Sequence, residues 1–137
     1  MADFYGAYGV VVEKAGRMRL PGDTSDAFRD AAYMCKWPGP CVKIYPPKEW
    51  DEYISILKDL GKRRDKATEW EVRTVFGSRE KVSVKGKGRL TIPQELRDYA
   101  NLKGGEKILV IGAMDHLELW ASDDAYNAAM DRAEWQG

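Results

Sequence analysis

Hydrophobic and polar residues alternate along several short segments of this chain, which predicts β-strands. Residues 10–12 and 82–84 each lead into a tight turn that contains glycine, and residues 17–20 and 89–92 lead out of it. In the outgoing segments every second side chain is hydrophobic, which is the period of a strand with one buried face. We therefore expect each turn to join two strands.

A period near 3.6 residues predicts two longer helices. The first follows Pro46 and Pro47, and its hydrophobic residues recur at the helical spacing over residues 50–60. The second follows Ser122, a suitable N-cap, and carries a hydrophobic stripe over residues 126–133. Both stripes indicate helices that pack against a core.

Shorter helices are expected between these elements. A proline in the first turn and a leucine–tyrosine face predict a helix over residues 93–102, and residues 23–32 form a weaker counterpart. Residues 61–77 are expected to be partly helical after position 64. Three hydrophobic side chains of that segment are expected to be buried: Trp70, Val75 and Phe76.

The same order of elements occurs twice. The stretch VSVKGKGRLTIP (82–93) repeats the layout of VVEKAGRMRLP (11–21), 72 residues earlier, and HLELWASDDAYNA (116–128) repeats CVKIYPPKEWDEY (41–53) at a distance of 75 residues. Each copy predicts a strand, a turn, a strand, a short helix, one or two strands and a long helix. The sequence therefore predicts an α+β fold built from two similar copies.

These copies occupy residues 1–60 and 79–137, and residues 61–78 are a partly helical connector. A unit of about 60 residues buries too little surface to be comfortably stable alone. We therefore expect the two copies to pack pseudo-symmetrically around one shared core.

Charge is unevenly distributed, although 22 basic and 22 acidic residues give the 137-residue chain a formal net charge of zero. Residues 79–89 carry a net charge of +4 and residues 58–66 carry +3, whereas residues 115–137 carry −5. Such asymmetry is typical of a protein with one face that binds a polyanion. Residues 62–66 (KRRDK) are nevertheless expected to be a solvated part of the connector.

The two turns have side chains suited to nucleic acid. Arginine can bind phosphate, or the O6 and N7 atoms of guanine, through two parallel hydrogen bonds, and lysine supplies a point charge for the DNA backbone. Gly16 and Gly88 are expected to allow the tight turns. The predicted DNA contacts are Lys14, Arg17, Arg19, Lys85, Lys87 and Arg89.

Sequence motifs of enzymes are missing. The stretch KGKGR lacks the spacing of a phosphate-binding P-loop, and no nucleophile with a neighbouring base is indicated. We expect no enzymatic activity, no cofactor and no small-molecule substrate. No hydrophobic run approaches the ~20 residues of a membrane span, and the first residues do not resemble a secretory signal. The expected location is the cytoplasm.

Metal binding is not expected either. Zinc sites usually need four cysteine or histidine ligands, and the sequence contains only Cys35, Cys41 and His116. Both cysteines are expected to be reduced and structural. His116 is expected on a strand surface, without a functional role.

The sequence resembles the MraZ family. FYGAYGVVVEKAGRMRLP (4–21) is similar to the opening motif of that family, and VKGKGRLTIPQELRDYANL (84–102) to its second copy. IYPPKEWDEY (44–53) and LELWASDDAYNAAM (117–130) are similar to the segments that close the two copies. The resemblance covers essentially the whole chain.

This resemblance implies a fold of two AbrB/SpoVT-like swapped-hairpin β-barrel repeats in one chain, each followed by an amphipathic helix. It implies a homo-oligomeric ring that binds double-stranded DNA and regulates transcription from the nucleoid. The implied target is a set of short tandem G-rich repeats at the promoter of the division and cell-wall gene cluster.

Four positions depart from the family pattern. Glu13 replaces an aspartate four residues before Arg17, whereas the equivalent of Glu13 in the second turn is Lys85, which reverses the charge. If the family carboxylate holds its arginine, the second turn has lost that bond and gained a cation. Tyr5 and Val10 replace an arginine and a histidine. These changes imply an altered base preference.

Two alternatives remain open from the sequence. AbrB-like barrels also occur in antitoxins, which bind a partner protein through an extended tail, although this chain predicts a helix there instead. A ring-forming scaffold that has lost specific DNA recognition is the other alternative, because of Lys85 and Tyr5.

Overall fold

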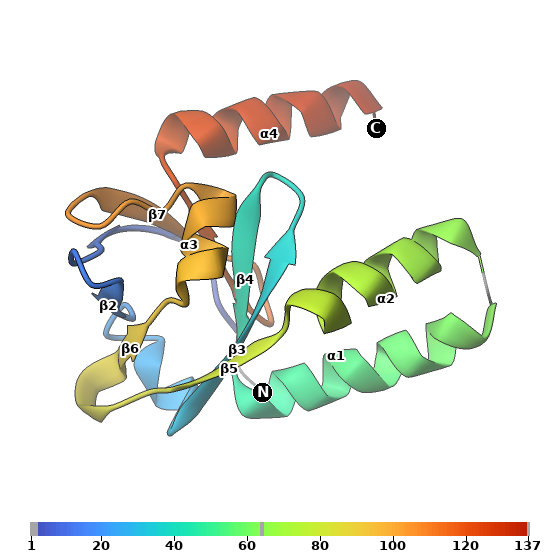
Figure 1. Ribbon diagram of the computed structural model, residues 1–137, viewed down its shortest axis with the longest axis horizontal. Helices are drawn as coiled ribbons and strands as arrows, with labels where there is room; N and C mark the ends of the chain where they lie inside the picture. Colours follow the sequence, from blue (N-terminus) through green and yellow to red (C-terminus); the bar gives the residue numbers. More distant parts are fainter. Residues whose placement is uncertain (1–2, 64, 137) are drawn as a thin grey trace.

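Eight strands and four α-helices form a mixed α+β structure in the computed structural model, which describes residues 3–63 and 65–136 (Figure 1). Six strands build one antiparallel sheet in the order β1 (Ala7–Val11), β7 (Lys107–Gly112), β8 (Leu117–Trp120), β4 (Cys41–Tyr45), β3 (Ala31–Trp37) and β5 (Glu80–Ser83). The other two strands form a ribbon: β2 (Arg17–Arg19) and β6 (Arg89–Thr91). The predicted fold class, α+β, is confirmed at this level.

Helices connect and cover these strands. The α-helices are α1 (Pro47–Leu60), α2 (Lys66–Ser78), α3 (Gln94–Ala100) and α4 (Asp123–Gln136), and single 3₁₀ turns occur at Ser25–Ala27, Gly61–Arg63 and Gly86–Gly88. In the described part of the chain, none of the helices is both long and apolar enough to cross a membrane.

The strand register has the symmetry of the sequence repeat. Val42 pairs with Leu119 and Ile44 with Leu117, although the repeat aligns Val42 with Leu117 and Ile44 with Leu119. Such an exchange of partners is what a two-fold axis between β4 and β8 produces. The first strands of the two copies are exchanged as well, since β1 pairs with β7 and β5 pairs with β3.

One hydrophobic core contains residues of both copies, as the sequence predicted. The four residues that pair around the pseudo-two-fold axis are fully buried in this core: Val42, Ile44, Leu117 and Leu119. Burial of these apolar side chains is the main stabilising contribution of the fold. Other members of the core include Val12, Met18, Leu20, Val84, Leu90, Ile92, Ile108 and Val110.

A second, smaller core lies where α1 and α2 pack against β3 and β4. Its aromatic residues stack, with ring centroids 5.4 Å apart for Tyr33 and Trp50 and 4.9 Å for Tyr45 and Tyr53. Both cysteines are free and buried. Burial raises the pKa of the Cys35 thiol to about 12 despite the nearby Lys43 ammonium, so this thiol is protonated at neutral pH.

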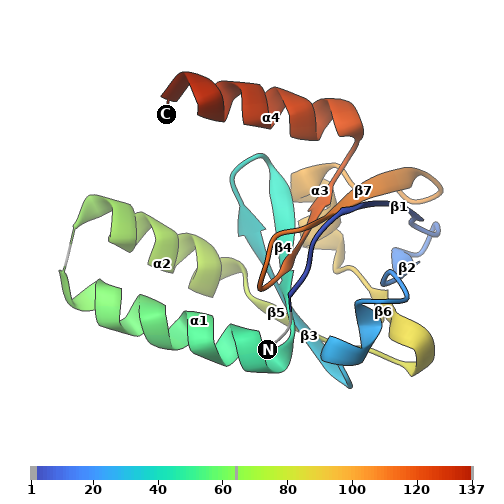
Figure 2. The ribbon, with the colours of Figure 1, turned by 180° about the vertical axis from the view of Figure 1, so that it is seen from behind.

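Helices α1 and α2 form a hairpin that projects from the sheet on the side opposite the β2–β6 ribbon (Figures 1 and 2). Val75 is buried as predicted, but Trp70 and Phe76 are 48% and 44% exposed. The prediction of burial was therefore wrong for these two side chains: Val75 lies on the inward face of α2, whereas the next residue, Phe76, lies outside that face, and Trp70 is covered only in part, by its contact with the Trp37 ring. The basic residues Lys62 and Arg63 at the hairpin end are exposed; residue 64 lies outside the described residues.

The helix predicted over residues 23–32 is mostly absent. Only a 3₁₀ turn over Ser25–Ala27 forms, and β3 begins at Ala31. The Thr24 hydroxyl donates a hydrogen bond to the Pro21 carbonyl (2.7 Å), and such local bonds favour turns over helices. Arg29 then has a left-handed φ of 53°, which ends any helical run.

His116 is buried, so the prediction of a surface position was wrong. Its Nδ1 atom lies 2.7 Å from Asp115 Oδ1, its Nε2 atom lies 3.4 Å from Glu118 Oε2, and its ring stacks on Tyr45 with centroids 4.8 Å apart. The Trp120 indole donates a hydrogen bond to the other Glu118 oxygen (3.0 Å). His116 thus belongs to a polar cluster at the edge of the second core.

The Glu118 carboxyl group of this cluster is expected to make the stability of the protein depend on pH. Burial opposes ionisation of Glu118, but its hydrogen bonds with His116 and Trp120 outweigh that effect and lower its pKa below the ordinary value of 4.5. A lowered pKa in the folded state stabilises the protein above the unfolded-state pKa, and the stabilisation is lost as pH falls through the folded-state value.

We therefore expect wild type to be more stable than Glu118→Gln at neutral pH. The difference should shrink below about pH 4. Urea denaturation of both proteins at several pH values between about pH 3 and pH 7 measures this difference in the free energy of unfolding. A difference that does not change with pH would show that the Glu118 charge makes no contribution.

Candidate nucleic-acid interface

The two glycine-containing turns have equivalent backbone bonds. The Glu13 amide donates to the Arg17 carbonyl (2.8 Å), and the Lys85 amide donates to the Arg89 carbonyl (2.8 Å). Each turn therefore holds the residue four positions before its arginine directly beside that arginine. The local sequence dictates this arrangement in both copies.

Gly16 and Gly88 lie where each turn meets the other copy. Both have left-handed φ angles, 87° and 79°, which glycine adopts at little cost. The Gly16 carbonyl accepts a hydrogen bond from the Ile92 amide (2.9 Å), and the Gly88 carbonyl accepts one from the Leu20 amide (2.8 Å). These symmetric bonds connect each turn to the strand that leaves the other turn.

The ribbon formed by β2 and β6 brings the arginines of both copies together. Arg17 pairs with Thr91, and Arg19 pairs directly with Arg89. All four of these side chains are exposed, while Met18 and Leu90 between them are buried. The exposed face of the ribbon is therefore lined by arginine on both strands.

A groove of about 770 Å³ runs beside the ribbon. It is open to solvent and combines residues of both turns with the edges of β1 and β5. Arg17, Arg19, Lys85 and Arg89, predicted from the sequence as DNA contacts, all line it. The other lining residues are Val11, Glu13, Met18, Val82, Ser83, Leu90 and Thr91.

The charges of this groove are only partly balanced. Arg17 Nε lies 3.0 Å from Glu13 Oε2 in an ion pair with both side chains largely exposed. Across the ribbon, Arg19 and Arg89 face each other, and like charges at directly opposed positions destabilise a sheet. An anion bound between them would relieve that repulsion.

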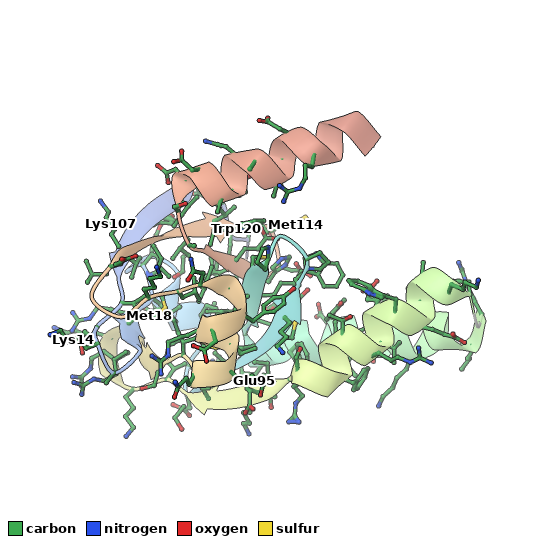
Figure 3. The ribbon with its side chains drawn as sticks, turned by 45° about the horizontal axis from the view of Figure 1, so that its top comes forward. Lys14, Met18, Glu95, Lys107, Met114 and Trp120 are labelled. Atoms are coloured by element: carbon green, nitrogen blue, oxygen red, sulfur yellow. The ribbon has the colours of Figure 1, made fainter. Side chains whose placement is uncertain are left out.

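Lys14 and Lys87, the remaining predicted contacts, do not line the groove. Both are exposed at the tips of the turns, and Lys87 has a left-handed φ of 60°. Figure 3 shows Lys14 at the edge of the molecule, far from the α1–α2 hairpin, while Met18 lies within the body. The turn tips thus extend the basic surface beyond the groove.

Sequence reasoning missed two polar residues of the groove. Thr91 occupies the position in the second copy that Arg19 occupies in the first, so the repeat alignment could have indicated it. Ser83 precedes the second turn on β5, where the first copy has Val11, and only the structure places it in the groove. Both hydroxyl groups are suited to hydrogen bonds with phosphate oxygens.

Within the described ranges, no group of three or more His, Cys, Asp or Glu side chains has the arrangement of a metal site. The groove combines cationic and hydroxyl groups, and among its described lining residues only Arg17 has an acidic partner. Its chemistry suits a polyanion.

Comparison with known proteins gives a consistent result. The family model described as "MraZ protein, putative antitoxin-like" matches residues 75–135. A protein of Desulforamulus reducens named transcriptional regulator MraZ is 30% identical over 127 residues, which cover 91% of this chain and 87% of that protein. Proteins of the same name from Caldicellulosiruptor saccharolyticus (31% over 119 residues; 87% and 81%) and Pseudomonas syringae pv. tomato (29% over 133 residues; 93% and 85%) are similar.

Proposed function

The chain belongs to the MraZ family of transcriptional regulators, and we propose that it binds DNA sequence-specifically through the groove beside the β2–β6 ribbon. The observation that carries this proposal is the convergence of Arg17, Arg19 and Arg89 on one exposed ribbon. Guanidinium groups bind phosphates and guanine edges, and a two-stranded β-ribbon is narrow enough to enter the major groove.

The proposed target is the set of short tandem G-rich repeats at the promoter of the division and cell-wall gene cluster that the family resemblance implies. Arginine is the side chain that most often recognises guanine, which supports G-rich DNA. We propose a homo-oligomeric ring in which successive chains meet successive repeats, acting at the nucleoid.

The proposed architecture is two AbrB/SpoVT-like swapped-hairpin repeats, residues 1–60 and 79–137, joined by the connector 61–78. The exchange of β1 and β5 between the two copies supports this interpretation. The symmetric pairing of β4 with β8 supports it as well.

Fluorescence anisotropy tests the proposed function. A labelled duplex that carries tandem TGGG-type repeats and a scrambled duplex of equal length are titrated with protein at several salt concentrations. We expect a preference for the repeats that persists as salt rises, because base contacts are less salt-sensitive than phosphate contacts. Equal, steeply salt-sensitive binding would contradict sequence specificity. No binding to either duplex would favour the scaffold or antitoxin-like alternative.

Variants at the ribbon separate binding from folding. Arg17→Gln and Arg89→Gln are each expected to weaken repeat binding while the circular dichroism spectrum stays unchanged, because both side chains are exposed. Lys62→Gln, at the exposed end of the α1–α2 hairpin, is the matched control and should bind like wild type. Loss of fold in the arginine variants would make these residues structural.

A further inference from the structure

We propose that the two ends of the groove have different roles, and that Arg19, Lys85 and Arg89 form a single phosphate-binding cluster at one end. The Glu13–Arg17 end then carries little net charge. This inference deepens the proposed DNA-binding function. Its test with duplex DNA rests on that function, whereas its test with pyrophosphate does not. It concerns the charge reversal between Glu13 and Lys85, which are equivalent in the repeat.

The strand register determines which charges meet. Because β2 and β6 are antiparallel, Arg19 of the first copy lies opposite Arg89 of the second. Lys85 is held beside Arg89 by two backbone hydrogen bonds, of 2.8 and 2.9 Å, that join the two residues in both directions. Arg19 of the first copy and the Lys85–Arg89 pair of the second copy, 66 and 70 residues away in the sequence, thus lie at the same end of the ribbon.

The other end is different. There Arg17 lies opposite the uncharged Thr91 and forms an ion pair with Glu13 at 3.0 Å. The two charges cancel, and a phosphate would have to compete with the Glu13 carboxylate for the Arg17 guanidinium. Among the described residues that line the groove, Glu13 is the only carboxylate.

The three cations of the cluster have no acidic partner in the described part of the chain, where no salt bridge involves Arg19, Lys85 or Arg89. Two planar guanidinium groups with one ammonium group provide both directed hydrogen bonds and a point charge. That combination suits the oxygens of a phosphodiester. The hydroxyl group of Ser83, which also lines the groove, is a further donor.

An unequal pair of turns has a consequence for DNA binding. A symmetric groove would bind the two directions of a duplex equally well, whereas one strong phosphate contact per chain favours a single direction. In direct, head-to-tail repeats, each repeat has the same orientation along the duplex and offers its phosphates at the same relative position. The asymmetry therefore matches this chain to tandem repeats of one orientation.

A pyrophosphate titration tests the cluster without DNA. In ¹⁵N NMR spectra, we expect the Nε–H signals of Arg19 and Arg89 to shift on titration and the Arg17 signal to change little. Lys85→Glu should weaken pyrophosphate binding about tenfold, because the new carboxylate can pair with Arg89 as Glu13 pairs with Arg17. Equal shifts of all three arginines, or an unchanged affinity in Lys85→Glu, would overturn the proposal.

Salt dependence of duplex binding is the second measurement. Lys85→Gln and Arg89→Gln should each reduce the slope of log K against log salt by about 0.9. Arg17→Gln should reduce it by less, and Glu13→Gln should strengthen binding. Equal slopes for Arg17→Gln and Arg89→Gln would refute the asymmetry.

The two measurements keep the proposals distinct. If wild type binds pyrophosphate at the cluster but no duplex, the proposed function fails and the cluster remains. If wild type binds DNA and the two turns contribute equally, only the asymmetry fails. Lys62→Glu serves as the control for a general effect of net charge in both experiments.

Discussion

Replacement of Leu119 with alanine is expected to lower the free energy of unfolding by about 2–5 kcal/mol. Leu119 is fully buried and lies beside the pseudo-two-fold axis, where it pairs with Val42 of the other copy and with Val110. The substitution removes three carbon atoms from a closely packed core, and the surrounding strands can fill the resulting cavity only in part. Both copies should lose stability together, because they share this core.

Urea denaturation followed by circular dichroism measures this effect. We expect one cooperative transition at a lower urea concentration in Leu119→Ala than in wild type. The control is Ile56→Ala on α1, whose side chain is 57% exposed and whose loss should change stability by only about 0.5 kcal/mol or less. Two separate transitions in the variant would contradict a shared core.

Replacement of Gly88 with alanine is expected to destabilise the protein by about 2 kcal/mol and to weaken DNA binding. A side chain at a left-handed φ of 79° costs about 1–2 kcal/mol. The new Cβ atom would also lie 2.8 Å from Ser25 Cβ and 3.2 Å from Leu20 Cβ, so these neighbours would have to move. Since Leu20 donates a hydrogen bond to Gly88, that movement disturbs the ribbon that carries the arginines.

Gly86 provides a control two residues away in the same turn. A Cβ atom there would have no neighbour within 4 Å, so Gly86→Ala should leave both stability and DNA affinity close to wild type. Thermal denaturation and fluorescence anisotropy on the three proteins measure the two effects. Similar behaviour of Gly86→Ala and Gly88→Ala would show that the turn conformation is unimportant.

Local patterns determined most of the secondary structure. The stripe over residues 50–60 and the first-turn Pro93 predicted α1 and α3, because side-chain period and proline geometry act over one or two turns of chain. The failure over residues 23–32 has the opposite cause. Ala31 and Ala32 pair with Ser83 and Val82 of the other copy, and this long-range pairing extends a strand through the end of the weak helical pattern.

Local patterns could not predict the exposure of Trp70 and Phe76 or the burial of His116, because these also depend on contacts with distant parts of the chain. A hydrophobic residue on a helix is buried only if another element covers its face. In the α1–α2 hairpin, which projects from the sheet (Figure 2), only one face of α2 is fully covered, so Trp70 and Phe76 remain half-exposed while Val75 is buried. His116, in contrast, is covered by Tyr45 from a distant strand.

The sequence by itself indicated the four basic side chains that line the groove, since the turns are local features that occur twice, but it did not indicate the hydroxyl groups of Ser83 and Thr91. It also determined the repeat, and with it a family that the comparisons confirm. Only the tertiary structure decided which charges face each other. The antiparallel register places Arg19 opposite Arg89 and Arg17 opposite Thr91, because strand pairing depends on how two distant copies bury their hydrophobic faces together.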